Sequence, residues 1–123
     1  MIWASDTDKT ACSQLRECIA EFNFSGAVKV GHSNFFDLLP TDMTDRTGLI
    51  AINPPYGRRI GSRAESRQLY KAICDRLKQH YHGWNVVLIV PDKKQAKRIP
   101  FEFHTHPVSH GGLKAMLMTG RIT

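Results

Sequence analysis

An asparagine, two prolines and a tyrosine stand together near the middle of this chain, directly after a short apolar run. The run is Leu49 to Ile52, and the corner that follows it is Asn53-Pro54-Pro55-Tyr56. A short, partly β-branched apolar run is typical of a buried strand in a parallel sheet. Prolines donate no N–H and fix φ at about −65°, so the strand must end at Asn53. Because ligands bind at the carboxyl ends of strands in open α/β sheets, this corner is a candidate site.

The corner has the groups that could activate an exocyclic amine. Such a nitrogen is a poor nucleophile because its lone pair is delocalised into a ring or a carbonyl. Hydrogen bonds from the NH2 to the Asn53 side-chain oxygen and the Pro54 carbonyl would draw the nitrogen toward tetrahedral geometry. Tyr56 could hold a planar target by stacking, at about 1–3 kcal/mol per base. With a sulfonium as methyl donor, catalysis is mostly positioning. We interpret the motif as an amine-methylating site, with a plain Pro-rich turn as the alternative.

Several segments of the chain, in this order and spacing, resemble the catalytic domain of S-adenosylmethionine-dependent RNA guanine-N2 methyltransferases. They are Ser5-Asp6-Thr7-Asp8, Asn53-Pro54-Pro55-Tyr56-Gly57 with Arg59, Leu69-Tyr70, Gly83-Trp84 and Gly111-Gly112-Leu113. These enzymes join a THUMP RNA-binding domain to a Rossmann-like methylase, and they act on large-subunit ribosomal RNA or tRNA. The resemblance covers nearly the whole chain. It implies S-adenosylmethionine as cofactor and methylation of guanine N2 in RNA, with ribosomal RNA favoured over tRNA.

The resemblance also implies positions for the cofactor. A carboxylate just past a strand end can accept both ribose hydroxyls, and Asp6 has that place, with an N-cap role or a ribose role for Asp8 as alternatives. Asn34 stands where the family has an acidic residue that accepts from the adenine amine, and an amide oxygen can accept too. Phe35 could cover the adenine face or belong to the core. Asn53 is expected to contact the cofactor as well as the target.

The positive charge is concentrated after the candidate site. Residues 58–98 carry eleven Lys and Arg against three acidic residues, in a chain whose net charge is +6. Flanking phosphates of an inserted nucleotide would lie close to this segment. We therefore expect contacts to the nucleic-acid backbone from the arginines nearest the motif, which are Arg58, Arg59, Arg63 and Arg67. For the later basic residues, a solvated helix face is at least as good an interpretation.

Alternating strands and helices predict an α/β fold, a mostly parallel Rossmann-like sheet with a C-terminal antiparallel pair. The strands are expected at residues 2–5, 28–32, 49–52 (as the central strand), 84–90, 101–106 and 113–118. A first helix, capped by Thr7 or Asp8 and ended by Gly26, has its apolar positions on one stripe: Ala11, Leu15, Cys18, Ile19 and Phe22. Further helices are expected around residues 69–81 and 93–99.

A Gly-rich strand-turn that cradles the methionine end of the cofactor does not precede Asp6. Residues 1–123 therefore resemble a partial catalytic domain that lacks the first strand, and we expect weak binding of the cofactor. That strand would lie between the strands that end at Ser5 and Ile52. We expect those two strands either to pair directly or to support self-association through exposed sheet edges.

Composition and motif spacing narrow the remaining classes of function and location. The chain has no long apolar stretch and no leader pattern, which argues against membrane contact and favours the cytoplasm. Its three cysteines are interpreted as small buried hydrophobes. The pairs His80/His82 and His104/His106 lack further ligands of suitable spacing, so no metal site is expected.

Two alternative functions remain, which are DNA adenine-N6 methylation and a degenerate, non-catalytic RNA-binding module. The Asn-Pro-Pro-Tyr tetrapeptide also occurs in DNA adenine and protein glutamine methyltransferases, so it does not choose the substrate by itself.

Overall fold

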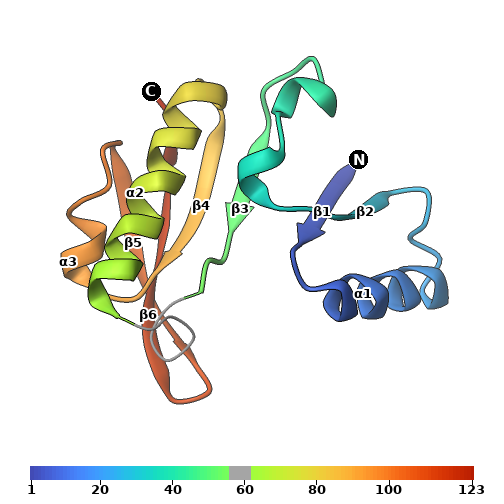
Figure 1. Ribbon diagram of the computed structural model, residues 1–123, viewed down its shortest axis with the longest axis horizontal. Coiled ribbons are helices and arrows are strands. Elements are labelled where there is room, and N and C mark those ends of the chain that lie inside the picture. Colours follow the sequence, from blue (N-terminus) through green and yellow to red (C-terminus); the bar gives the residue numbers. More distant parts are fainter. Residues whose placement is uncertain (56–61) are drawn as a thin grey trace. The chain divides into compact units, whose positions relative to one another are not determined.

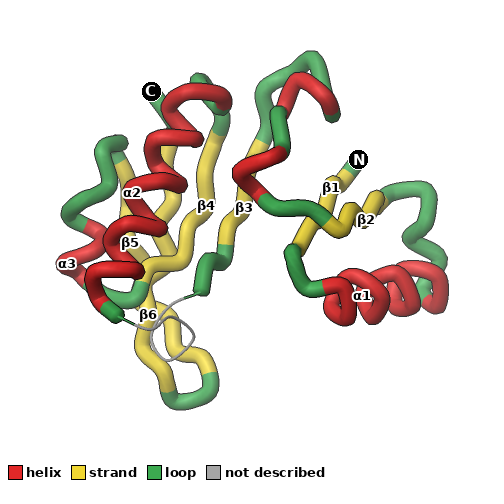
Figure 2. Tube along the Cα trace, viewed as in Figure 1, coloured by secondary structure: helices red, strands yellow, loops and turns green. Residues whose placement is uncertain are grey.

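The computed structural model describes residues 1–55 and 62–123, which form two compact units, Met1–Asp45 and Arg46–Thr123. The first unit contains β1 (Ile2–Asp6), α1 (Lys9–Glu21), β2 (Val28–His32) and the short 3-10 helices Phe35–Asp37 and Pro40–Asp42. The second contains β3 (Leu49–Ile52), α2 (Arg63–His80), β4 (Asn85–Val90), α3 (Lys93–Ala96), β5 (Phe103–His110) and β6 (Leu113–Arg121). Figure 1 labels these elements and Figure 2 colours them by type. The predicted α/β class is confirmed.

In the first unit, α1 connects two parallel strands. β1 and β2 pair in register from Ile2 opposite Val28 to Asp6 opposite His32. The helix begins at Lys9, and Asp8 before it accepts hydrogen bonds from the backbone N–H groups of Thr10 and Ala11, so the cap is Asp8 rather than Thr7. The prediction that Gly26 ends the helix was wrong. It ends at Glu21, and Asn23 takes the left-handed conformation (φ 60°) that turns the chain toward β2.

The buried stripe predicted for α1 was only partly correct. Cys12 and Ile19 are the buried side chains of this helix, whereas Cys18 is exposed and Leu15 and Phe22 are 39% and 63% exposed. Periodicity identifies the apolar side of a helix, but the amount of burial depends on the surface that it packs against. Two strands of five residues each offer too small a surface to cover a helix of 13 residues.

The second unit has a four-stranded sheet in the order β3-β4-β6-β5. β3 and β4 are parallel, while β6 runs antiparallel to both of its neighbours, so the predicted C-terminal antiparallel pair is confirmed. Alternate residues of β4 are buried, as is one side of α2, which lies along the sheet in Figure 1. The buried side chains of these two elements are Tyr70, Ile73, Cys74, Leu77, Val86, Leu88 and Val90. Each large apolar side chain stabilises the unit by about 1.5–3 kcal/mol.

The prediction that residues 49–52 form a central strand was wrong. β3 lies at the edge of its sheet, and Leu49 is 62% exposed. In the described part of the chain, β1 pairs with β2 and β3 pairs with β4, and the two strands do not pair with each other. The direct closure between them that we considered is therefore not seen, and both strands keep one unpaired edge.

The C-terminal hairpin differs from its prediction in length. Pro107, expected between two strands, lies inside β5 opposite Met116. An edge strand tolerates proline because the missing N–H can face solvent. The turn is made by Gly111 and Gly112, both with positive φ. α3 ends at Ala96 instead of reaching residue 99, and β6 extends to Arg121 instead of ending near residue 118.

A buried hydroxyl joins α2 to the sheet. Tyr70 is fully buried, and its OH donates a 2.7 Å hydrogen bond to the backbone carbonyl of Ile89 in β4. We expect Tyr70→Phe to lower the free energy of unfolding by about 1–3 kcal/mol, because the carbonyl then loses a buried partner. Urea denaturation followed by circular dichroism measures this. An unchanged midpoint and slope would contradict the role assigned to this bond.

No helix of the described residues is both long and apolar enough to cross a membrane.

Candidate cofactor and amine-binding site

Asp6 is the last residue of β1, and its carboxylate is held in a defined orientation. One oxygen, Oδ1, accepts a 2.8 Å hydrogen bond from the backbone N–H of Asp8. Oδ2 has no hydrogen-bond partner among the described residues, and the side chain is exposed. The cap role that competed for Asp6 belongs to Asp8 instead, whose Oδ1 accepts from the N–H groups of Thr10 and Ala11. Asp6 Oδ2 can therefore accept further donors such as hydroxyl groups at this strand end.

Asn34 follows the neighbouring strand and lies close to the same edge. The backbone N–H of Ser33 donates to the Asp6 carbonyl at 3.0 Å, which holds the two strand ends together. The Asn34 side-chain oxygen accepts from the N–H of Phe36 at 3.0 Å and caps the 3-10 helix Phe35–Asp37. That oxygen keeps a second lone pair and the side chain is exposed, so Asn34 can both accept and donate.

Phe35 lies half-buried beside Phe36. Their rings are 5.2 Å apart between centroids, at an interplanar angle of 66°. This edge-to-face pair fixes the Phe35 ring while leaving part of it accessible. The structure therefore brings Asp6, Asn34 and Phe35 to neighbouring strand ends of one unit.

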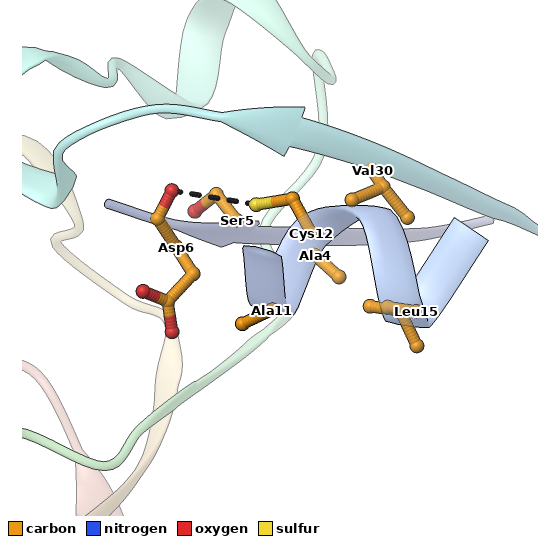
Figure 3. A pocket seen from close by; sticks show the side chains of 7 residues that line it. All are labelled: Ala4, Ser5, Asp6, Ala11, Cys12, Leu15 and Val30. Atoms are coloured by element: carbon orange, nitrogen blue, oxygen red, sulfur yellow. Dashed lines mark hydrogen bonds between the residues drawn. The ribbon is translucent and has the colours of Figure 1, made fainter. Parts of the chain in front are cut away.

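A small hollow opens between β1, β2 and α1 (Figure 3). Its volume is about 130 Å³, and its lining is mainly apolar: Ala4, Ser5, Asp6, Ala11, Cys12, Leu15 and Val30. The Cys12 thiol lies 3.5 Å from the Asp6 carbonyl oxygen and 3.7 Å from that of Gly31, where it can donate weakly to either. Ligand pockets usually enclose about 300–1,000 Å³, so this hollow alone is too small for a nucleoside.

Asn53 immediately follows β3 at its carboxyl end. Its side chain is exposed and forms no hydrogen bond with any described residue, whereas the ring of Pro54 is buried and Pro55 is exposed. The burial of Pro54 anchors the turn, so the Asn53 amide is presented from a fixed backbone. Tyr56, Arg58 and Arg59, which the sequence also singled out, lie outside the described residues. The Asn53 corner and the Asp6 site belong to different units.

Arg63 and Arg67 are both exposed in the first turns of α2. Ser62 caps this helix by accepting from the N–H of Glu65 at 3.1 Å. The two arginines are four residues apart and lie on one side of the helix, next to its positive N-terminal end. Lys71, one turn further, pairs with Asp75 at 2.7 Å, so its charge is balanced locally. Arg63 and Arg67 are therefore placed where they can bind an anion.

Sequence reasoning did not single out His32, the last residue of β2. Its Nε2 lies 2.9 Å from the carbonyl oxygen of Thr7, in the turn that follows Asp6. The signal was a histidine two residues before Asn34, at a strand end expected to face the cofactor. Its contact with Thr7 joins residues 25 positions apart, which no local pattern reveals.

Comparison with known protein families gives the context for this geometry. Residues 1–108 match the family model described as RMKL-like, methyltransferase domain. The chain belongs to this family. The family resemblance inferred from the sequence is thereby confirmed, and so is the assignment to the methyltransferases.

Curated relatives carry names of RNA methyltransferases. Ribosomal RNA large subunit methyltransferase K/L of Syntrophotalea carbinolica is 28% identical over 115 residues, which are 92% of this chain and 16% of that protein. The protein of the same name in Desulfotalea psychrophila is 30% identical over 118 residues, 94% of this chain and 16% of that protein. A Synechocystis protein named as a presumed RNA methyltransferase is 30% identical over 118 residues, 95% of this chain and 30% of its own length. The chain thus spans less than a third of each of these relatives.

Solved structures confirm the Rossmann-like methyltransferase fold. The crystal structure of SMU.472 in complex with SAH superposes with a TM-score of 0.82 at 18% identity, covering 99% of this chain and 32% of that one. The methyltransferase domain of METTL16 gives a TM-score of 0.73 at 12% identity and covers 98% of this chain and 50% of that one.

Proposed function

We propose that this chain is part of the catalytic domain of an enzyme that methylates the exocyclic N2 amine of guanine in ribosomal RNA, with S-adenosylmethionine as the methyl donor. The observation that carries the proposal is the exposed Asn53 amide at the carboxyl end of a parallel strand, followed by a buried Pro54. The names of the curated relatives support ribosomal RNA as the substrate class. Such a substrate also suits a cytoplasmic protein.

In this proposal, Asn53 and Pro54 hold the target amine. The Asn53 side-chain oxygen and the Pro54 carbonyl each accept one hydrogen bond from the NH2 group, which localises the nitrogen lone pair. Held in this way, the amine would present its lone pair to an activated methyl group, and its surplus proton would pass to water. Pro55 stiffens the turn, and Tyr56 stacks on the base. The contribution of these residues is orientation, which can supply much of the rate enhancement in a bimolecular transfer.

The cofactor would be held by residues of the first unit, Asp6, Asn34 and Phe35. Bound S-adenosylmethionine supplies an activated methyl group on a sulfonium leaving group. Asp6 Oδ2, which has no partner among the described residues, is suited to ribose hydroxyls, and Asn34 is suited to the adenine edge. The accessible part of the Phe35 ring would cover the adenine base.

Methyl transfer by the native gene product that contains this chain tests the proposal. With isotopically labelled S-adenosylmethionine, we expect label in undermodified ribosomal RNA, less in tRNA and none in duplex DNA. Label in DNA adenine, with ribosomal RNA inert at the same salt concentration, would replace the proposal with the DNA alternative. Binding of RNA without any transfer would favour the non-catalytic module.

We also infer that Arg63 and Arg67, together with Arg58 and Arg59, contact RNA phosphates. Replacing Arg63 and Arg67 by alanine should weaken RNA binding and reduce the slope of log affinity against log salt by about 0.7–0.9 for each lost phosphate contact. Filter binding across a salt series measures both effects.

The matched control for this pair is Lys93→Ala with Lys94→Ala. These residues are two exposed cations on α3 that we interpret as a solvated face. The control removes the same charge, and it should leave the slope nearly unchanged. Equal slopes for both double variants would show that only the net charge matters and would remove the assignment of Arg63 and Arg67.

We further propose that the chain self-associates through the unpaired edges of β1 and β3. Both strands carry exposed apolar side chains, with Ile2 61% and Leu49 62% exposed, and open edges recruit other strands. Sedimentation velocity should show a mass that increases with concentration. Ala51→Lys, on the β3 edge, should favour the monomer. Ala20→Lys, at an exposed position of α1, should not. A monomer at every concentration would contradict this proposal.

A further inference from the structure

The imidazole of His32 joins the ends of β1 and β2 through its side chain. Nε2 lies 2.9 Å from the carbonyl oxygen of Thr7. A carbonyl oxygen only accepts, so Nε2 must carry the proton and donate it. His32 is also the register partner of Asp6, and partners in a sheet place their side chains on the same side. The ring therefore lies on the same side of the sheet as the Asp6 side chain, and it bonds the residue that follows Asp6.

Among the described residues, the last backbone hydrogen bond between the ends of β1 and β2 is made by Asp6. The Asp6 carbonyl oxygen accepts from the N–H of Ser33 at 3.0 Å, and the Cys12 thiol lies within reach of the same oxygen. Beyond Asp6, the His32 ring is the group of β2 that bonds the turn, within the part of the chain that the structure describes. The position of the turn at Thr7 relative to β2 thus depends on this side chain.

The position of Thr7 matters because the next residue orients the carboxylate. The N–H of Asp8 donates to Asp6 Oδ1 at 2.8 Å, and Oδ2 has no hydrogen-bond partner among the described residues. Asp8 is fixed on its other side by its role as the cap of α1. A turn that moves away from β2 would displace the Asp8 N–H and release the Asp6 carboxylate.

We propose that His32 is a positioning residue of the cofactor site, which holds the turn of residues 6–8 so that Asp6 Oδ2 is aimed at the ribose hydroxyls. This inference rests on the function proposed above, because it assigns Asp6 to the ribose. His32 does not react. It acts through Thr7 and Asp8, and losing it should change the affinity for the cofactor while leaving the fold of the unit intact.

Two substitutions separate the hydrogen bond from the rest of the side chain. In His32→Gln, the side-chain amide reaches about as far as Nε2 and can still donate to the Thr7 carbonyl. In His32→Leu, the volume is similar and the donor is lost. His104→Leu is the matched control, because His104 is an exposed strand imidazole of β5 in the other unit.

Nuclear magnetic resonance of the full ¹⁵N-labelled chain provides two independent readouts. The first is hydrogen exchange of the Asp8 amide without any ligand. We expect His32→Leu to accelerate it about three- to tenfold, the effect of one lost hydrogen bond, while His32→Gln and His104→Leu remain near the wild-type rate. Unchanged exchange in His32→Leu would overturn the inference.

The second readout is a titration with S-adenosylhomocysteine, followed at the amides of Asp6, Asn34 and Phe35, which detects weak binding. We expect His32→Leu to bind about three- to tenfold more weakly and His32→Gln to recover most of the affinity. Equal affinity in His32→Leu and the wild type would overturn the positioning role. Absence of shifts in the wild type would instead refute the cofactor assignment of Asp6, and the exchange experiment distinguishes the two failures.

Discussion

Asn53→Ala, in the native gene product that contains this chain, is expected to lower the rate of methyl transfer to RNA by about 100-fold or more. Removal of one preorganised hydrogen-bonding group at a reacting centre commonly has an effect of this size. The Asn53 amide is exposed at the end of β3 and makes no hydrogen bond with the described residues, so its loss should cost the fold little. Steady-state kinetics with labelled cofactor measure the change.

Which kinetic parameter changes is as informative as the size of the change. Because Asn53 acts on the amine during reaction, kcat should fall while the apparent affinity for the cofactor changes only a few-fold. Asn85→Ala is the matched control, since Asn85 is an exposed asparagine at the opposite end of the neighbouring strand, β4. Near-normal turnover by Asn53→Ala, or an equal loss in Asn85→Ala, would contradict the assigned mechanism.

Gly120→Ala is expected to destabilise the second unit by about 2–4 kcal/mol, beyond the usual range for surface substitutions. Gly120 lies in β6 between Val86 of β4 and Phe103 of β5. A Cβ atom there would come within 2.4 Å of the Glu102 carbonyl oxygen and 3.3 Å of the Phe103 Cα. Both of these contacts are with backbone atoms, so the clash can be relieved only if β5 moves away from β6.

Thermal or urea denaturation measures the effect, and Gly26→Ala is its control. Nothing lies within 4 Å of a Cβ built at Gly26, and its φ is not positive. That substitution should be neutral or stabilise slightly, by about 0.4–1 kcal/mol, because alanine restricts the unfolded chain. If Gly120→Ala leaves the free energy of unfolding unchanged, β5 and β6 are not packed as closely at this point as the structure shows.

Much of the local structure could be predicted because its causes are local. The two prolines after Ile52 require the strand to end at Asn53, and the structure ends β3 there. Asp8 was one of two predicted caps, and its carboxylate holds two N–H groups at the start of α1. The continuous apolar run at residues 86–90 likewise predicted a buried strand, and the structure has β4 there with alternate residues buried.

The errors concern features that depend on distant parts of the chain. Leu15 and Phe22 belong to the predicted apolar stripe, but both are exposed, because two short strands cannot cover them. The place of β3 at a sheet edge depends on which strands pair, and Pro107 is tolerated within β5 because that strand is also an edge. The contact of His32 with Thr7 forms only when β1 and β2 align. None of these facts is encoded in a short window of sequence.

The identity of the methylated nucleoside tests the central claim most directly. Undermodified ribosomal RNA would be incubated with the native gene product and methyl-deuterated S-adenosylmethionine, digested to nucleosides and analysed by mass spectrometry. The account predicts deuterated N2-methylguanosine as the main product, absent with the Asn53→Ala enzyme. Deuterium in N6-methyladenosine, in a ring-methylated base or in a ribose 2′-O-methyl group would contradict it.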